Sequence, residues 1–433
     1  MESALNSGDT AWVLTSAALV LLMIPGLAFF YGGMTRVKSV LNMLMMVMGA
    51  LFIVGILWVA FGYSVAFGDN LGDVGLLGNP TQFAWLEGLM TDDPEASLPV
   101  MAFVAFQAMF ACITVGLIAG AVADRTKFSA WMVFSAIWAT LVYFPVAHWV
   151  WASGGWIFEL GVIDFAGGTA VHINAGAAAL ALVFVIGKRV GWPKTAMRPH
   201  NLTLVMIGAG LLWFGWFGFN AGSALAANNA ASVVFVNTFV ATCAAGLAWL
   251  LVEKLRDGHA TSLGAASGIV AGLVAITPSC SAVSPVGAIL IGIAAGVLCA
   301  LAVGLKYKLG YDDSLDVVGV HLVGGLVGTL LIGFLATSAA PAGVDGLFYG
   351  GGADQLGKQA IGAFAVLFYS LIVAAIIGVL IKVTMGIRID KDEEVGGIDL
   401  VLHAESAYEL GDTGGGGVFA GVGHAARTHS EVQ

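Results

Sequence analysis

Charged side chains are scarce in this chain of 433 residues: Asp, Glu, Lys and Arg together make up only 10% of it. Soluble domains carry about a quarter charged residues, so this scarcity excludes a soluble globular protein. The net charge of −10 gives no indication of nucleic-acid binding. The chain is 59% apolar and contains 60 glycines. Because glycine lets helices approach closely in a bilayer, the composition predicts a membrane protein.

Cysteine is rare too, and the four cysteines show no paired spacing. Three lie in or near apolar segments and are expected to act as small hydrophobic residues, whereas Cys280 falls in a predicted outer loop. The N-terminus carries Glu2 and Asp9 but no basic segment, so we expect no cleaved signal peptide. No cofactor or metal is expected.

Apolar segments of about 20 residues, long enough to cross a bilayer, recur along the chain. We predict an all-α membrane protein with eleven transmembrane helices in residues 1–385, followed by a cytoplasmic tail, 386–433, that is flexible from about residue 412. The predicted spans are 11–31, 41–67, 100–122, 130–150, 164–187, 201–223, 232–252, 261–277, 285–305, 316–336 and 359–385.

The basic residues predict the orientation of these spans. If the N-terminus is outside, every Lys and Arg of the 17 except Lys358 falls on the cytoplasmic side. A missed helix would invert everything after it, so this bias supports an odd number of spans, N-out and C-in, in the cell membrane.

Strongly polar residues inside a span are costly and are functional candidates by default. Asp164 precedes two glycines and is placed to cap a helix start, or to contact a cation directly; both roles are compatible. His172 follows eight residues later, near the same helix face. His321, which follows Asp316, holds the matching place in span ten. Because two five-span halves would run in opposite senses, inverted repeats would bring both histidines to the membrane midplane.

Aromatic residues flank these positions. Phe106 and Phe110 share a face of the third span, Trp151 follows the fourth, and Phe219 lies four residues before Ser223. Taken singly, each is typical of packing or of an interfacial aromatic belt.

Five blocks in order carry a family resemblance: Phe30–Gly33, Phe110–Thr114, Asp164–Thr169 with His172, Gly215–Ser223 and Asp316–His321. On these blocks the chain resembles the ammonium transporter family (Amt/Mep/Rh), on its Amt branch, along nearly its whole length. The resemblance implies two inverted five-helix repeats plus a final helix, a homotrimer, and one pore in each subunit.

The resemblance also implies roles for individual residues. Phe110, Trp151 and Ser223 would form an outer recruitment site for ammonium or its analogue methylammonium, supported by Asp164. Phe110 and Phe219 would form a gate, and His172 and His321 the pore histidines, with neither a catalytic residue nor a metal ligand among them. The interval from Trp151 to Asp164 is one residue longer than in the bacterial pattern.

A chemical argument supports this assignment. A bare ammonium ion entering a low dielectric would cost tens of kcal/mol, whereas ammonia is neutral and imidazoles can carry the proton. Potassium has no proton to give up, so deprotonation would also provide selectivity.

The tail blocks Gly386–Arg388, Glu393–Asp399 and His403–Tyr408 resemble the cytosolic segment that couples pores in the trimer, a face that a PII-type signal protein blocks in many relatives. Ala404 departs from the family, which usually has Gly there. His403, His424 and His429 are expected to be solvated.

Three other functions stay open. A neutral ammonia or carbon dioxide channel would use the same pore. An intramembrane metal enzyme would need a third ligand from Asp164 or Asp316 beside the histidines. An ammonium sensor would report occupancy through the tail or a partner, although no appended signalling domain is expected.

Overall fold

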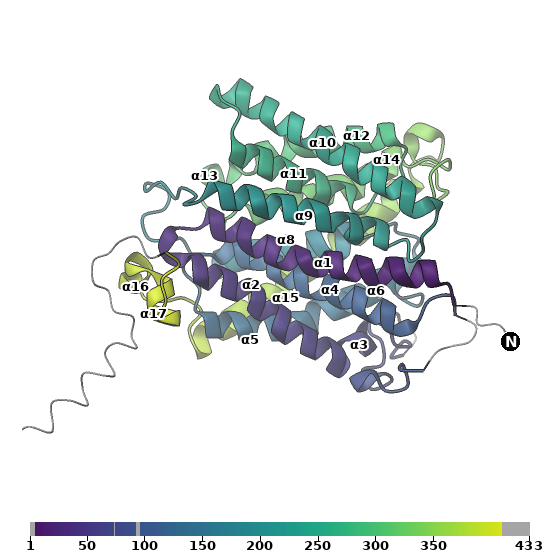
Figure 1. Ribbon diagram of the computed structural model, residues 1–433, viewed down its shortest axis with the longest axis horizontal. Helices are drawn as coiled ribbons and strands as arrows, with labels where there is room; N and C mark the ends of the chain where they lie inside the picture. Colours follow the sequence, from purple (N-terminus) through teal and green to yellow (C-terminus); the bar gives the residue numbers. More distant parts are fainter. Residues whose placement is uncertain (1–4, 73, 92–95, 409–433) are drawn as a thin grey trace, which may run out of the picture.

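The computed structural model describes residues 5–72, 74–91 and 96–408, and these residues form one helical bundle (Figure 1). The predictions for the flexible segment from about 412, for His424 and for His429 concern residues outside these ranges. The α-helices are α1 (Ser7–Met34), α2 (Val40–Leu57), α3 (Tyr63–Phe67), α4 (Val100–Ala119), α5 (Phe128–Trp138), α6 (Phe144–Trp151), α7 (Trp156–Glu159), α8 (Asn174–Ile186), α9 (Leu202–Gly222), α10 (Asn229–Asp257), α11 (Ser262–Ile276), α12 (Pro285–Ala302), α13 (Leu305–Leu309), α14 (Val323–Leu335), α15 (Asp354–Thr384), α16 (Lys391–Gly396) and α17 (Ile398–His403).

Among the described residues, ten helical segments are long and apolar enough to cross a membrane. They correspond to ten of the predicted spans. The remaining one, 261–277, is α11, whose 15 residues give a rise of about 22 Å against about 30 Å of hydrocarbon. The chain is therefore a multi-pass membrane protein, while the eleventh crossing and the N-out orientation stay predictions.

Several spans contain a short π-helical turn. Two of these turns, η6 (Gly168–Ile173) and η7 (Val318–Leu322), begin the helices that continue as α8 and α14. Both helices start later than the sequence predicted, at 168 rather than 164 and at 318 rather than 316. His172 and His321 each lie in one of the π turns, which occur frequently at functional sites. Each histidine is the last residue but one of its π turn, as expected if the second half of the bundle repeats the first.

The first helices of the two predicted halves, α1 and α9, lie side by side (Figure 1). Glycine makes the contact close, since a Cβ added at Gly208 of α9 would collide with the main chain of Phe30 in α1. Such small-residue contacts are the usual basis of helix association in a bilayer. α8 packs against α15.

The start of the tail packs on the end of the bundle opposite to the start of α1 (Figure 1). The Arg388 guanidinium pairs with Glu394 at 2.5 Å, and Glu394 accepts the N–H of Val190 at 2.6 Å. Asp399 accepts the N–H groups of Leu41 and Asn42 at the start of α2.

The expectation that His403 is solvated was wrong. Its Nε2 lies 3.0 Å from Oδ1 of Asn42, and its ring lies edge-on to Phe128 at 5.4 Å. The helix α17 places this side chain against the bundle, where it is half-buried.

Candidate functional site

The Asp164 carboxylate caps the helix that carries His172. It is 6% exposed and accepts four main-chain N–H groups, from Gly167, Gly168, Thr169 and Ala170, at 2.5–3.2 Å. Gly167 has φ +113°, a conformation that favours glycine. The capping role predicted for Asp164 is therefore present in the structure, and it places a carboxylate at the positive end of the helix dipole.

Trp151 ends α6 and is tied to the same loop. Its indole N–H donates to the main-chain oxygen of Asp164 at 2.9 Å. The interval between the two residues contains the short helix α7. Trp151 is half-buried, with its ring edge-on to Phe110 at 5.9 Å between centroids.

Phe110 in turn stacks on Phe219, with centroids 4.1 Å apart and ring planes at 24°. Both rings are almost fully buried. Ser223, at the end of α9, donates its hydroxyl to the main-chain oxygen of Phe219 at 2.9 Å. This leaves the lone pairs of the Ser223 oxygen free to accept a hydrogen bond from another donor.

His172 and His321 lie beyond the stacked phenylalanines. Their Nδ1 atoms are 3.3 Å apart, and the rings lie within 24° of parallel at 5.3 Å. The His172 ring also stacks on Trp216 at 5.4 Å and faces Phe219 at 6.2 Å. Two neutral imidazoles share one proton between facing nitrogens only when one donates and the other accepts, which requires opposite tautomers.

A small cavity adjoins the histidine pair. Its volume open to the centre of a water-sized sphere is about 10 Å³, roughly the space that one water molecule needs. Apart from the histidine nitrogens its walls are apolar. The lining residues are Met23, Leu27, Phe30, Ile113, Leu117, Val171, His172, Leu212, Trp216, Phe219, Val270 and His321.

In the second half, the structure assigns the cap to a residue that the sequence reasoning missed. Asp313 accepts the N–H groups of Val317 and Val318 at 3.1 and 2.7 Å. Asp316 has φ +64° and pairs instead with Lys306 at 2.6 Å. A signal was available, because Asp313 precedes His321 by eight residues, the interval that separates Asp164 from His172.

The arrangement gives no support to a metal-binding enzyme. The Asp164 carboxylate is engaged by four N–H groups and Asp316 by a lysine. Across the described parts of the chain, no three His, Cys, Asp or Glu side chains group as a metal ion requires.

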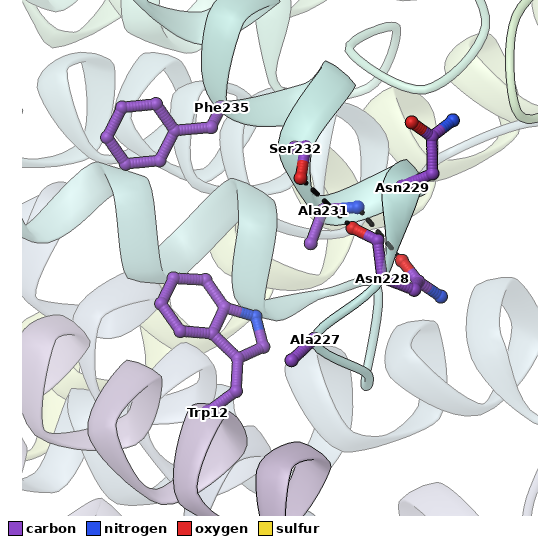
Figure 2. Close-up of a pocket in the computed structure, with 7 residues that line it drawn as sticks. All are labelled: Trp12, Ala227, Asn228, Asn229, Ala231, Ser232 and Phe235. Atoms are coloured by element: carbon purple, nitrogen blue, oxygen red, sulfur yellow. Dashed lines mark hydrogen bonds between the residues drawn. The ribbon is translucent and has the colours of Figure 1, made fainter.

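A second, much larger pocket lies apart from this site. Figure 2 shows Trp12 of α1 facing the start of α10 across it, with Asn228, Ser232 and Phe235 on the other walls. Its volume is about 590 Å³, and none of the predicted site residues lines it. Figure 2 also shows that Asn228 caps α10 through the N–H of Ala231, so its amide has a structural role.

A buried ion cluster lies at the tail end of the bundle. Arg189 pairs with Asp124 at 3.0 Å and with Asp312 at 2.8 Å. Burial raises the pKa of the Asp312 carboxyl, but the hydrogen bonds and charge of Arg189 outweigh burial and hold that pKa below its ordinary value. Asp312 adjoins Asp313, so the cluster fixes the loop that begins the His321 helix.

Comparison with known proteins agrees with this geometry. The sequence profile of the Ammonium Transporter Family matches residues 11–408. The chain belongs to the ammonium transporter family. It is 61% identical to proteins named "Ammonium transporter" from Mycobacterium bovis and Mycobacterium tuberculosis, covering 94% of this chain and 91% of theirs. A Bacillus subtilis ammonium transporter is 45% identical over 94% of this chain and 99% of its own.

Solved structures of the family share the fold. The crystal structure of Saccharomyces cerevisiae Mep2 superposes with a TM-score of 0.86 at 34% identity, covering 95% of this chain and 93% of Mep2. A chain named "Sensor Amt Protein" superposes with a TM-score of 0.84 at 29% identity, covering 92% of this chain and 98% of that one. Family membership and the apolar helices identify an integral protein of the cell membrane, and its relatives are named as transporters rather than enzymes.

Proposed function

We propose that this protein recruits ammonium at an outer aromatic site, removes its proton, and conducts ammonia through the cavity at His172 and His321. The observation that carries this proposal is a continuous file of rings. Successive centroids from Trp151 to His321 lie 5.9, 4.1, 6.2 and 5.3 Å apart. The file runs from the half-buried Trp151 into the buried centre of the bundle.

Recruitment would use the Trp151 face, the Ser223 hydroxyl and the negative potential of Asp164. A cation over an aromatic face gains up to ~2 kcal/mol when partly desolvated. The Ser223 oxygen can accept an ammonium N–H because its own proton is already donated to Phe219. Asp164 acts from behind, since its carboxylate is fully occupied by main-chain donors.

The stacked rings of Phe110 and Phe219 would act as a gate. Their 4.1 Å separation leaves no room for a hydrated ion to pass between them. The rings must move for each passage, and the ion must shed water to follow.

The histidine pair would take and pass the proton. With Nδ1 of His172 protonated and shared with Nδ1 of His321, Nε2 of His172 is a bare acceptor. It can receive a proton from ammonium; its Nδ1 proton then moves to Nδ1 of His321, which releases one from Nε2. The first transfer makes His172 an imidazolium and the second makes His321 one. Both rings are neutral again only after the proton leaves Nε2 of His321, and ammonia continues alone. A potassium ion of similar size has no proton to release and would meet the full cost of a bare charge.

The assembly and partner are proposed from family membership. We propose a homotrimer with one pore in each subunit, and residues 386–433 as a cytoplasmic regulatory tail that a PII-type signal protein can contact. Arg388 and Glu394 of the tail bond to the end of α8 and the loop after it, and Asp399 bonds to the start of α2. A bound partner would thereby reach both regions.

Initial uptake into vesicles, at fixed total ammonium and rising pH, tests the proposal. Raising the pH multiplies neutral ammonia while the cation concentration barely changes. A cation-recruiting transporter should show nearly constant initial rates, whereas rates that follow the ammonia concentration would favour the neutral-gas channel. Absence of uptake would favour a sensor, the role for which one structural relative is named.

A further inference from the structure

Gln359 of α15 is fully buried and uses its whole amide. Its Oε1 accepts the N–H of Ile163 at 2.7 Å, and its Nε2 donates to the oxygen of the same Ile163 at 2.7 Å. The Nε2 also lies 3.2 Å from the main-chain oxygen of Thr329 in α14. A side-chain amide that satisfies both main-chain groups of one residue fixes that residue in position and orientation.

Ile163 is the residue directly before Asp164. The hydrogen bonds from Gln359 to Ile163 therefore hold the segment that contains Asp164. From this segment the Asp164 carboxylate caps η6, and the Asp164 main-chain oxygen accepts the Trp151 indole N–H. Because Thr329 lies in the helix that continues from His321, the same amide joins the outer loop to the second half of the bundle. Nothing in the sequence pattern around Gln359 had indicated this role.

The corresponding loop of the second half is held differently. There Lys306 donates to the main-chain oxygen of Asp313 at 2.9 Å and pairs with Asp316. The inner cap is thus held by a positive charge, while the outer cap is held by a neutral amide. Among the described residues, the ion pairs include none to Asp164, so its negative charge is not offset by a neighbouring cation.

We propose that Gln359 is a positioning residue for the recruitment site: it fixes Asp164, and through it Trp151, without bringing a positive charge beside the incoming cation. This inference rests on the proposed function. Gln359 touches no substrate position itself and acts only through the loop at Ile163.

A matched control lies one turn away. Gln355 is also buried, and it donates to the oxygen of Gly161 at 3.2 Å and to Oε1 of Gln359 at 2.9 Å. Gln355→Leu leaves both bonds between Gln359 and Ile163 intact, so it reports the cost of removing a buried glutamine from this helix.

The test compares Gln359→Met, Gln359→Glu and Gln355→Leu in proteoliposomes, by the concentration dependence of the ammonium current. For Gln359→Met we expect the half-saturating concentration to rise about tenfold, the size of effect of losing buried hydrogen bonds, with the maximal current within about twofold of wild type. Gln355→Leu should leave the half-saturating concentration within about twofold of wild type.

Gln359→Glu tests the role of the hydrogen bonds to Ile163 through the pH dependence of the half-saturating concentration, which a purely structural role of Gln359 would not change. A protonated Glu can still donate to Ile163, but an ionised Glu faces two carbonyl oxygens. The half-saturating concentration of this variant should therefore rise with pH while that of the wild type stays flat. This variant also decides the matter if Gln359→Met does not assemble.

Two outcomes would overturn the inference: half-saturation unchanged in Gln359→Met, or no added pH dependence in Gln359→Glu. In either case, a raised half-saturating ammonium concentration in Trp151→Leu would still support the proposed function. If Trp151→Leu is also unchanged, it is the recruitment site itself that fails.

Discussion

Trp151 and Asp164 are joined by a hydrogen bond of 2.9 Å from the indole N–H to the main-chain oxygen. The same aspartate caps the helix of His172 with its carboxylate. One residue therefore links the half-buried aromatic ring at the mouth of the site to the helix that carries one of the two buried histidines.

Substituting Trp151 tests recruitment. Trp151→Leu removes both the aromatic face and the hydrogen bond, and we expect the half-saturating ammonium concentration to rise about tenfold or more. Trp151→Phe keeps a ring but not the donor, so its half-saturating concentration should lie between wild type and Leu. The measurement is the concentration dependence of ammonium-induced current. Equal values for Phe and Leu would mean that the ring face contributes nothing.

Breaking the buried ion cluster should destabilise the protein. Arg189→Met leaves Asp312 buried without its ion-pair partner and leaves Asp124 with only its longer pair to Arg36 at 3.5 Å; breaking a buried pair typically costs about 3–5 kcal/mol. Thermal unfolding in detergent should show a clearly lower midpoint. The exposed pair Arg256–Asp257 provides the control, since Arg256→Met should change the midpoint little.

The cluster should also make stability depend on acid. The folded-state pKa of Asp312 is depressed below its ordinary value of 3.8. Its contribution is therefore present above that ordinary value and is lost as the pH falls through the folded-state pKa. Asp312→Asn should be less stable than wild type at neutral pH and should lose less stability on acidification. Parallel pH curves for the two proteins would contradict this assignment.

The tail contains a residue in a strained conformation. Ala404, which ends α17, has φ +54° and ψ +31°, a left-handed conformation that costs a non-glycine residue about 1–2 kcal/mol. Ala404→Gly should therefore stabilise the docked tail by about 1 kcal/mol, seen as slower amide exchange in residues 398–408.

Asp399→Ala supplies the opposite case for the tail. It removes the acceptor of the N–H groups of Leu41 and Asn42, so exchange in the tail should become faster. Exchange in α10, which lies away from the tail, should be the same in all three proteins.

The sequence predicted the features that show as hydrophobic segments or as sequence motifs of the family. Hydrophobic runs located the spans, and the family blocks identified the aromatic and histidine residues that the structure places in one file. Helix starts were misplaced by a few residues because Asp164 caps from outside the helix and because Asp316 adopts a left-handed conformation. Neither effect appears in a hydropathy profile.

Contacts between distant segments could not be predicted in this way. Gln359 reaches a loop almost two hundred residues earlier in the chain, and a glutamine in an apolar helix gives no indication of its partner. His403 was expected in water because it follows the last span, yet α17 packs it on Asn42 and Phe128. Asp313 was missed because its neighbour Asp316 lies closer to the histidine motif in sequence.

The most direct test of the proposed mechanism is the current from proteoliposomes pulsed first with ammonium and then with potassium. The wild-type protein should give a current with ammonium alone. In a His172→Ala, His321→Ala double variant, that current should disappear or be replaced by one that potassium also carries. A double variant that still conducts ammonium and still excludes potassium would contradict proton removal at the histidine pair.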